Sequence, residues 1–164
     1  MAALDFDVIV VGAGHAGCEA AWAAAALGCS VGLCTLSTST IGTMPCNPAV
    51  GGTAKGQLVR EIDALGGLMG RAIDATGIQF KVLNQSRGPA VWAPRAQADK
   101  QRYAQWMAQV LATTPGITVV EGQVARLALQ GATATGVSLV DGRAFTGRSV
   151  VVTTGTFLNG VIHV

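Results

Sequence analysis

Charged and aromatic side chains are scarce in this sequence of 164 residues. Only 12% of the residues are Asp, Glu, Lys or Arg and only 5% are aromatic, while half are apolar. No uninterrupted apolar run reaches the roughly 18 residues typical of a membrane span, so we expect no membrane segment and interpret the hydropathy as buried strands and helices. The formal net charge of +2 is too small to indicate a nucleic-acid partner by itself.

Cysteine and histidine are also few, and their spacing argues against a metal site. The four cysteines, Cys18, Cys29, Cys34 and Cys46, form no C-x-x-C pair, and the sequence has only two histidines. We therefore expect no metal centre and no disulfide framework. The N-terminus lacks the basic and apolar segments of a secretory signal, which favours a cytoplasmic protein with free thiols.

The clearest motif is G-x-G-x-x-G, formed by Gly12, Gly14 and Gly17 between a strand-like run, 8–11, and an alanine-rich run, 18–27. In such a turn the first glycine permits the tight bend, the second lets a pyrophosphate approach, and the third lets the helix pack on the strand. The helix N-terminus adds free N–H groups and a positive dipole end. The motif predicts a dinucleotide ligand, and the alternative is a purely structural turn.

Residues 30–36 predict a second strand, which completes a βαβ unit. The acidic residue that often binds the ribose hydroxyls at the end of this strand is missing, which weakens any inference about NAD. Thr35 or Ser37 offers a hydroxyl there instead. We interpret His15, inside the motif, as a residue placed by backbone and packing needs rather than as a proton-transfer group.

Cys46 lies in an irregular segment, 37–56, that is rich in Gly, Pro, Ser and Thr and has no helical or strand period. Long ordered loops are often functional. A nearby cation such as Lys55 and free backbone N–H groups would make the thiol of Cys46 reactive. The alternative is an inert, half-buried cysteine in a loop that two prolines stiffen.

The remaining pattern indicates one α/β domain, because no linker divides it. From residue 117 onward, Gly-containing turns separate three or four strands, which predicts a small β-meander that returns to a final buried strand at 149–153. The other expected elements are helices at 57–65 and 68–75, a strand at 78–83, a loop at 84–94 and a long helix at 95–112.

Basic residues gather in the middle of the chain, with Trp92 among them. Lys and Arg neutralise phosphates and an exposed aromatic ring stacks on an unpaired base, so contact with RNA is one interpretation. The other is a solvated face that Glu61, Asp63, Asp74 and Asp99 balance, and composition alone favours it. The basic residues are Lys55, Arg60, Arg71, Lys81, Arg87, Arg95, Lys100 and Arg102.

Four longer strings resemble one known family, MnmG (also called GidA), over residues 7–163. They are VGAGHAGCEAA, MPCNPAVGGTAKGQLVREIDALGG, GIQFKVLNQSRGPAVWAPRAQADK and VVTTGTFLNG. The resemblance implies a Rossmann-like, FAD-binding α/β domain of the two-dinucleotide-fold type with a small β-meander. It also implies a cytoplasmic flavoprotein enzyme that adds a carboxymethylaminomethyl group to carbon 5 of the tRNA wobble uridine.

The same resemblance implies cosubstrates, partners and site residues. Methylene-tetrahydrofolate would supply the one-carbon unit, glycine the amine and NADH the electrons, with the GTPase MnmE as partner and a homodimer as the assembly. Cys46 would be catalytic, adding its thiolate to the uracil ring. Residues that would bind FAD are Gly12, Ala13, Gly14, His15, Ala16 and Gly17 at the pyrophosphate and Val124 at the adenine.

Members of this family continue beyond the point that corresponds to Val164. Residues 1–164 therefore resemble the N-terminal portion of an FAD/NAD(P)-binding domain, incomplete at its C-terminus, without the NADH-binding insertion and the C-terminal helical domain. Two alternatives remain open. One is the related folate- and FAD-dependent tRNA uracil-5-methyltransferase, and the other is a non-catalytic nucleotide-binding module.

Overall fold

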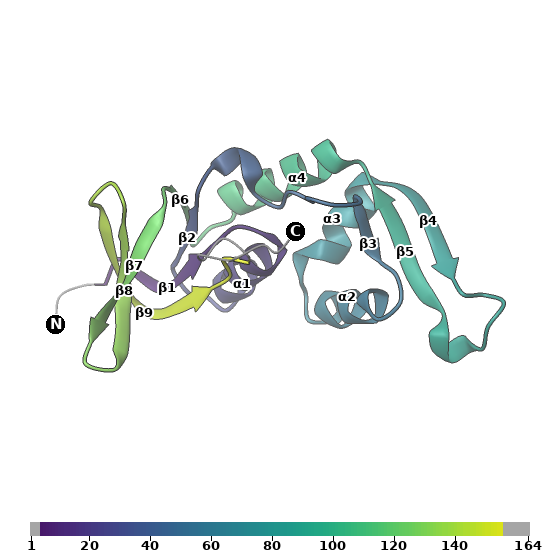
Figure 1. The fold of residues 1–164 in the computed structure, drawn as a ribbon, viewed down its shortest axis with the longest axis horizontal. Coiled ribbons are helices and arrows are strands. Elements are labelled where there is room, and N and C mark those ends of the chain that lie inside the picture. Colours follow the sequence, from purple (N-terminus) through teal and green to yellow (C-terminus); the bar gives the residue numbers. More distant parts are fainter. Residues whose placement is uncertain (1–3, 156–164) are drawn as a thin grey trace, which may run out of the picture. The chain divides into compact units, whose positions relative to one another are not determined.

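The structure, a computed structural model that describes residues 4–155, divides the chain into two compact units (Figure 1). Among the described residues, the first unit is built from 4–41 and 111–155, and the second from 42–110. The sequence predicts one α/β domain without a linker, and within it the structure has these two compact units. Residues 42–110 form a sheet of their own, with a separate set of strand pairings. No segment with the composition of a linker marks the boundaries of this unit in the sequence.

The first unit contains a six-stranded sheet in the order β6-β2-β1-β9-β8-β7. The neighbours β6, β2, β1 and β9 are parallel, whereas β7, β8 and β9 form an antiparallel meander. This confirms the α/β fold with a small meander. The bounds are β1 (Phe6–Val11), β2 (Val31–Thr35), β6 (Ile117–Glu121), β7 (Val124–Gln130), β8 (Thr133–Leu139) and β9 (Ala144–Val152).

Strand β9 joins the meander to the parallel strands. Its first residues pair with β8, and its later residues run beside β1 in the register Phe6↔Gly147 to Val11↔Val152. The expected burial of this strand was wrong, because Val151 and Val152 are 36% and 49% exposed. Among residues 4–155, α1 is the only helix with more than slight contact to β9, and that contact is small.

Helix α1 (His15–Ala26) follows β1 directly, as the sequence predicts. Its buried residues, Gly17, Cys18 and Ala21, are small, which lets the helix lie close to the sheet. The helix ends at Leu27 with a left-handed Gly28, φ 85°, whose N–H bonds to Ala25 while Cys29 N–H bonds to Ala24. These two bonds form a Schellman motif and confirm Gly28 as the stop signal.

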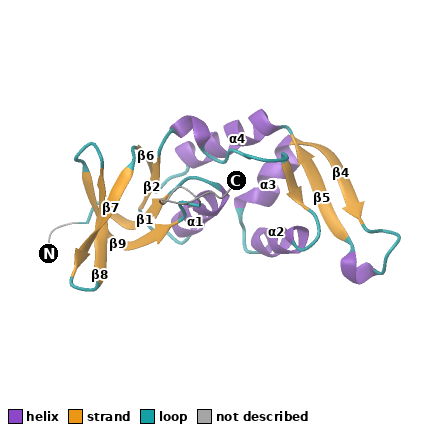
Figure 2. Cartoon of the chain, viewed as in Figure 1, coloured by secondary structure: helices purple, strands orange, loops and turns teal. Residues whose placement is uncertain are grey.

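The second unit packs two helices against a three-stranded antiparallel sheet in the order β3-β5-β4 (Figure 2). Helix α4 (Lys100–Thr113) begins in this unit and continues into the first, and two short 3₁₀ turns, η1 (Thr38–Thr40) and η2 (Pro89–Val91), complete the elements. The other bounds are β3 (Ala49–Gly51), α2 (Lys55–Ala64), α3 (Leu68–Thr76), β4 (Gly77–Leu83) and β5 (Ala93–Ala98).

Two sequence-based boundaries were wrong in this unit. Residues 95–98 belong to β5 rather than to the helix, because β5 pairs with both β3 and β4. Asp99 then starts α4, since its carboxylate accepts hydrogen bonds from the N–H groups of Gln101 and Arg102. Strand β3 also interrupts the segment that was expected to be loop throughout.

The described residues show two further absences. No helix within residues 4–155 combines the length and apolar character that crossing a bilayer requires. Over the same residues, no three side chains of His, Cys, Asp or Glu come together as potential metal ligands.

Candidate functional site

The glycine turn between β1 and α1 is fixed by its own backbone geometry. Gly12 has φ 103°, and its N–H donates to the carbonyl of Cys34 over 2.9 Å. A side chain at Gly12 is excluded, because its Cβ would lie 2.6 Å from the backbone oxygen of Thr153. The Thr153 hydroxyl also lies 3.0 Å from the carbonyl oxygens of Val11 and Gly12. Thr153 therefore holds the turn from the neighbouring strand.

The other two glycines of the motif differ from each other in what they permit. A Cβ on the buried Gly17 would overlap the carbonyl oxygen of Gly12, so only glycine lets α1 pack on the turn. Gly14 is exposed in an extended conformation, φ −72° and ψ −173°, and a Cβ there would meet nothing within 4 Å. The space beside Gly14 is thus open for a ligand.

The N-terminus of α1 beside Gly14 is suited to an anion. No side chain caps this helix end, and its first turn contains no acidic residue. The N–H groups of a first helical turn lack intrahelical partners and carry partial positive charge. Burial lowers the pKa of His15, with a smaller opposing effect of Glu19, which favours the neutral imidazole. The backbone and helix dipole therefore supply the attraction for a phosphate here.

The carboxyl ends of β1, β2 and β6 meet at the same edge of the sheet as the glycine turn. Thr35 is unsuited to bind a ribose, because it is 6% exposed and its hydroxyl donates to the carbonyl of Ser37. The carboxylate at this edge comes instead from Glu121, which lies opposite Thr35 in the register. Its Oε2 accepts from the N–H and hydroxyl of Thr38, at 2.7 and 2.8 Å, and these bonds lower its pKa.

Glu121 and Thr153 are residues of this edge that the sequence analysis missed. Each reaches the site through the pairing of parallel strands, so no short motif contains them with the glycines. The usable signal was their position just at the end of a predicted strand, where parallel strands place ligand-binding residues.

Val124 lies in the same unit as the glycine turn, at the start of β7. It is partly buried and packs against the core cluster that includes Ile9 and Val120. Only Gly122 and Gln123 separate it from the end of β6, and the N–H of Gly122 bonds to Thr35 at the end of β2. Val124 therefore follows directly on the edge where β1, β2 and β6 end.

Cys46 is exposed and lies in the second unit, in the segment before β3. The carbonyl of Pro48 in this segment accepts a bond from the N–H of Ala98, which ties the loop to the end of β5. Cys34, in contrast, is buried, and burial raises the pKa of its thiol to about 11 against an opposing effect of Arg143. Cys18 is buried as well, with its thiol donating to the carbonyl of Ala13.

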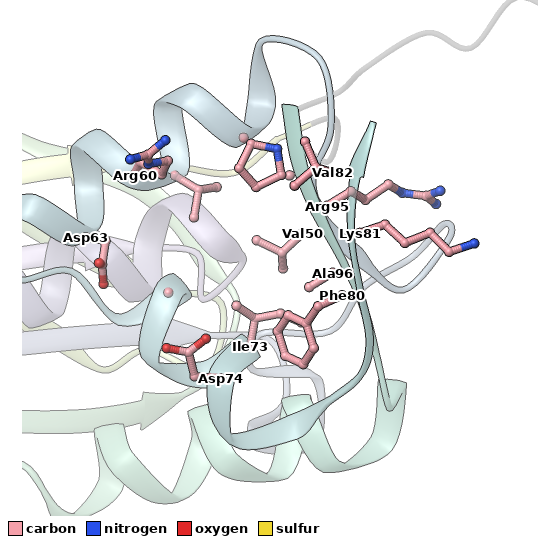
Figure 3. Close-up of a pocket in the computed structure, with 15 residues that line it drawn as sticks. Val50, Arg60, Asp63, Ile73, Asp74, Phe80, Lys81, Val82, Arg95 and Ala96 are labelled. Carbon is pink, nitrogen blue, oxygen red and sulfur yellow. The ribbon is translucent and has the colours of Figure 1, made fainter. Parts of the chain in front are cut away.

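A cavity of about 390 Å³ lies in the second unit between the sheet and helices α2 and α3 (Figure 3). Val50, Ile73 and Phe80 give it an apolar lining, while Asp63 and Asp74 enter from the helices. No motif in the sequence predicts this cavity, because its lining comes from five separate elements, β3, α2, α3, β4 and β5.

Comparisons with known proteins place the chain in a family. The model of the family described as glucose inhibited division protein A matches residues 7–164. The tRNA uridine 5-carboxymethylaminomethyl modification enzyme MnmG of Syntrophotalea carbinolica is 58% identical over 160 residues, which are 98% of this chain and 26% of that protein. The chain thus spans about a quarter of the length of the curated relatives it matches.

Solved structures agree with this assignment. Aquifex aeolicus GidA superposes with a TM-score of 0.91 at 52% identity, over 94% of this chain and 26% of that one. PqsL of Pseudomonas aeruginosa, a probable FAD-dependent monooxygenase, shares the fold, with a TM-score of 0.64 at 16% identity over 93% of this chain and 43% of its own. From its sequence and its fold, the chain belongs to the GidA family.

Proposed function

We propose that this chain forms the FAD-binding part of an enzyme that installs the carboxymethylaminomethyl group on carbon 5 of the tRNA wobble uridine. The observation that carries the proposal is the open space at Gly14 beside the uncapped N-terminus of α1. The names of the relatives, tRNA uridine 5-carboxymethylaminomethyl modification enzyme MnmG, support the reaction.

FAD fits this site by the chemistry of its donors. The pyrophosphate needs backbone N–H groups and room for close approach, and the turn from Gly12 to Gly17 supplies both. We assign Gly12, Ala13, Gly14, His15, Ala16 and Gly17 to the pyrophosphate and Val124 to the adenine. When bound, FAD supplies the redox chemistry of the reaction, and NADH is the proposed electron source.

Cys46 is the proposed nucleophile, and its exposed thiol in a tethered loop supports that role. Its sulfur would bond to the ring carbon next to carbon 5 of the uracil, which places electron density on carbon 5. Carbon 5 would then attack the methylene carbon of the iminium that methylene-tetrahydrofolate forms with glycine, and the C=N electron pair would move to the nitrogen. Loss of the carbon 5 proton then expels the thiolate and restores the ring double bond. Methylene-tetrahydrofolate and glycine are the proposed donors of the added group, with the GTPase MnmE as partner, a homodimer as the assembly and the cytoplasm as the compartment.

The test uses the natural protein with FAD, NADH, methylene-tetrahydrofolate, glycine, MnmE and unmodified tRNA, followed by nucleoside analysis. The proposal predicts carboxymethylaminomethyluridine at the wobble position and its loss in Cys46→Ser. A methylated uridine would instead identify the related uracil-5-methyltransferase activity. Flavin-free protein without any modified nucleoside would leave only a nucleotide-binding module and contradict the proposal.

A further inference from the structure

Lys81 and Arg95 form a pair of like charges directly across the sheet of the second unit. Lys81 in β4 is opposite Arg95 in β5 in the antiparallel register. Directly opposite residues in such a pair have Cβ atoms about 5 Å apart, and like charges at this separation destabilise the sheet. A negatively charged partner close to both side chains would offset this repulsion.

The second unit contains no such partner on this face among the described residues. Neither side chain makes an ion pair or hydrogen bond there. The neighbouring cross-strand pairs with the same orientation are Gln79↔Gln97 and Leu83↔Ala93, which carry no negative charge. The two cations are therefore accompanied only by neutral side chains.

Three of the four carboxylates of this unit, Asp63, Asp74 and Asp99, lie elsewhere. Figure 3 shows the charged ends of Lys81 and Arg95 extending from the sheet away from Asp63 and Asp74, which come from helices α2 and α3. Asp99 is engaged as the cap of α4. The second unit contains eight Lys and Arg and four Asp and Glu, whereas the first unit contains three Lys and Arg and five Asp and Glu. The positive charge of the chain is thus concentrated in the second unit.

We propose that this face of the β4 and β5 strands binds the phosphate backbone of the RNA substrate. Lys81 acts as a point charge, and the planar guanidinium of Arg95 contacts a phosphate through two N–H groups. The amides of Gln79 and Gln97 lie beside them as donors and acceptors for sugar or base edges. The inference rests on the proposed function and extends it by naming where the tRNA is held.

The experiment measures binding of a fluorescent anticodon stem-loop RNA with an unmodified wobble uridine to the natural protein over a range of salt concentrations. The double variant Lys81→Gln, Arg95→Gln is expected to bind about tenfold more weakly at moderate salt, and the slope of log affinity against log salt falls by about 0.7 for each lost contact. A matched control is Arg126→Gln, Arg148→Gln, which removes two exposed cations from the first unit and is expected to change little.

A second variant separates RNA binding from sheet stability. Lys81→Glu creates an opposite-charge pair with Arg95, so the account predicts a higher melting temperature together with weaker RNA binding. Equal affinities and salt slopes in the double variant and its control would overturn the inference. So would a lower melting temperature in the double variant with unchanged RNA binding, which would indicate pairing with carboxylates elsewhere in the protein.

The outcomes also separate this inference from the proposed function. Wild-type protein that modifies tRNA while the double variant binds RNA normally refutes the surface and leaves the function intact. Wild-type protein that binds the RNA through Lys81 and Arg95 but neither retains flavin nor modifies uridine supports the surface and refutes the function. Absence of RNA binding by the wild type refutes both.

Discussion

The hydroxyl of Thr153 lies 3.0 Å from the carbonyl oxygen of Gly12, so the residue that directly follows β9 holds the glycine turn that follows β1. These residues are 141 positions apart in the chain and meet only because β9 and β1 are parallel neighbours. The backbone oxygen of Thr153 also occupies the space that a side chain at Gly12 would need. The position of the turn thus depends on the last described strand.

Replacing Thr153 by Val tests this contact. The variant keeps the shape but removes the hydroxyl, and the lost hydrogen bonds are expected to lower the free energy of unfolding by about 1 kcal/mol. FAD affinity is expected to fall as well, because the turn is held less firmly. Urea denaturation and flavin titration measure the two effects. Thr154→Val serves as a neighbouring control, and equal effects of both variants would contradict a specific role for Thr153.

Gly12→Ala tests the same contact by adding a side chain to the turn. Its φ of 103° lies in a region that L-residues rarely adopt, and the added Cβ would lie 2.6 Å from the Thr153 oxygen. Both effects act on the folded state, so we expect a loss of about 2–4 kcal/mol in the free energy of unfolding. Gly131→Ala, a left-handed glycine with open space around its Cβ, isolates the conformational part of this cost. A smaller loss for Gly12→Ala than for Gly131→Ala would show that the close contact is unimportant.

Burial of His15 makes stability depend on pH. Its pKa is lowered in the folded protein, so the unfolded chain binds the proton more readily than the folded one. The free energy of unfolding therefore declines as the pH falls below about 6.5, the ordinary value for histidine. His15→Gln is expected to flatten the stability profile between pH 7.5 and 5.5. An unchanged profile in the variant would assign the effect to another group.

The carboxylates with a lowered pKa do not contribute to the change in stability between pH 7.5 and 5.5. Hydrogen bonds from Thr146, Ser30 and Thr38 lower the pKa values of Asp5, Asp7 and Glu121, respectively. Groups of this kind stabilise the fold above their unfolded pKa values, near 4, and the contribution is lost as the pH falls further. Denaturation at pH 5.5 and above consequently reports on His15 with these carboxylates charged.

The thiols are expected to react with iodoacetamide in a defined order. Cys46 is exposed and is expected to be alkylated first at pH 8, whereas Cys34 is buried with a pKa of about 11 and is expected to react only on unfolding. Peptide mass spectrometry over time measures each site, with the protein in denaturant as the reference for equal access. Alkylation of Cys34 at the rate of Cys46 in the folded protein would contradict the structure.

The first βαβ unit could be predicted because all its signals are local. The strand, the glycine turn, helix α1 and its stop at Gly28 follow one another in sequence. Residues 95–98, in contrast, are Arg, Ala, Gln and Ala, which favour helix in isolation, and they become part of a strand only because β3 and β4 pair with β5 on both sides. The division into two units depends on the same non-local pairings.

The candidate site was predictable to a similar extent. The glycines and Cys46 stand out in short motifs, whereas Glu121 and the Lys81 and Arg95 pair acquire meaning only from strand register. Lys81 and Arg95 are neighbours only because of the register in which β4 and β5 pair. Spacing along the chain alone contains no such information.

The most direct test of the account is the flavin content of the natural protein and of Gly14→Asp after incubation with FAD and gel filtration. Aspartate is favourable at the N-cap of α1, and a Cβ at position 14 has no atom within 4 Å. The variant is therefore expected to fold with equal or higher stability. Its carboxylate would take the N–H groups of the first turn and repel a pyrophosphate, while Gly14→Asn provides a neutral control of the same size. The account predicts flavin absorbance in the wild type, less in Gly14→Asn and none in Gly14→Asp. Full flavin retention by a folded Gly14→Asp would contradict the assignment of this turn to the pyrophosphate.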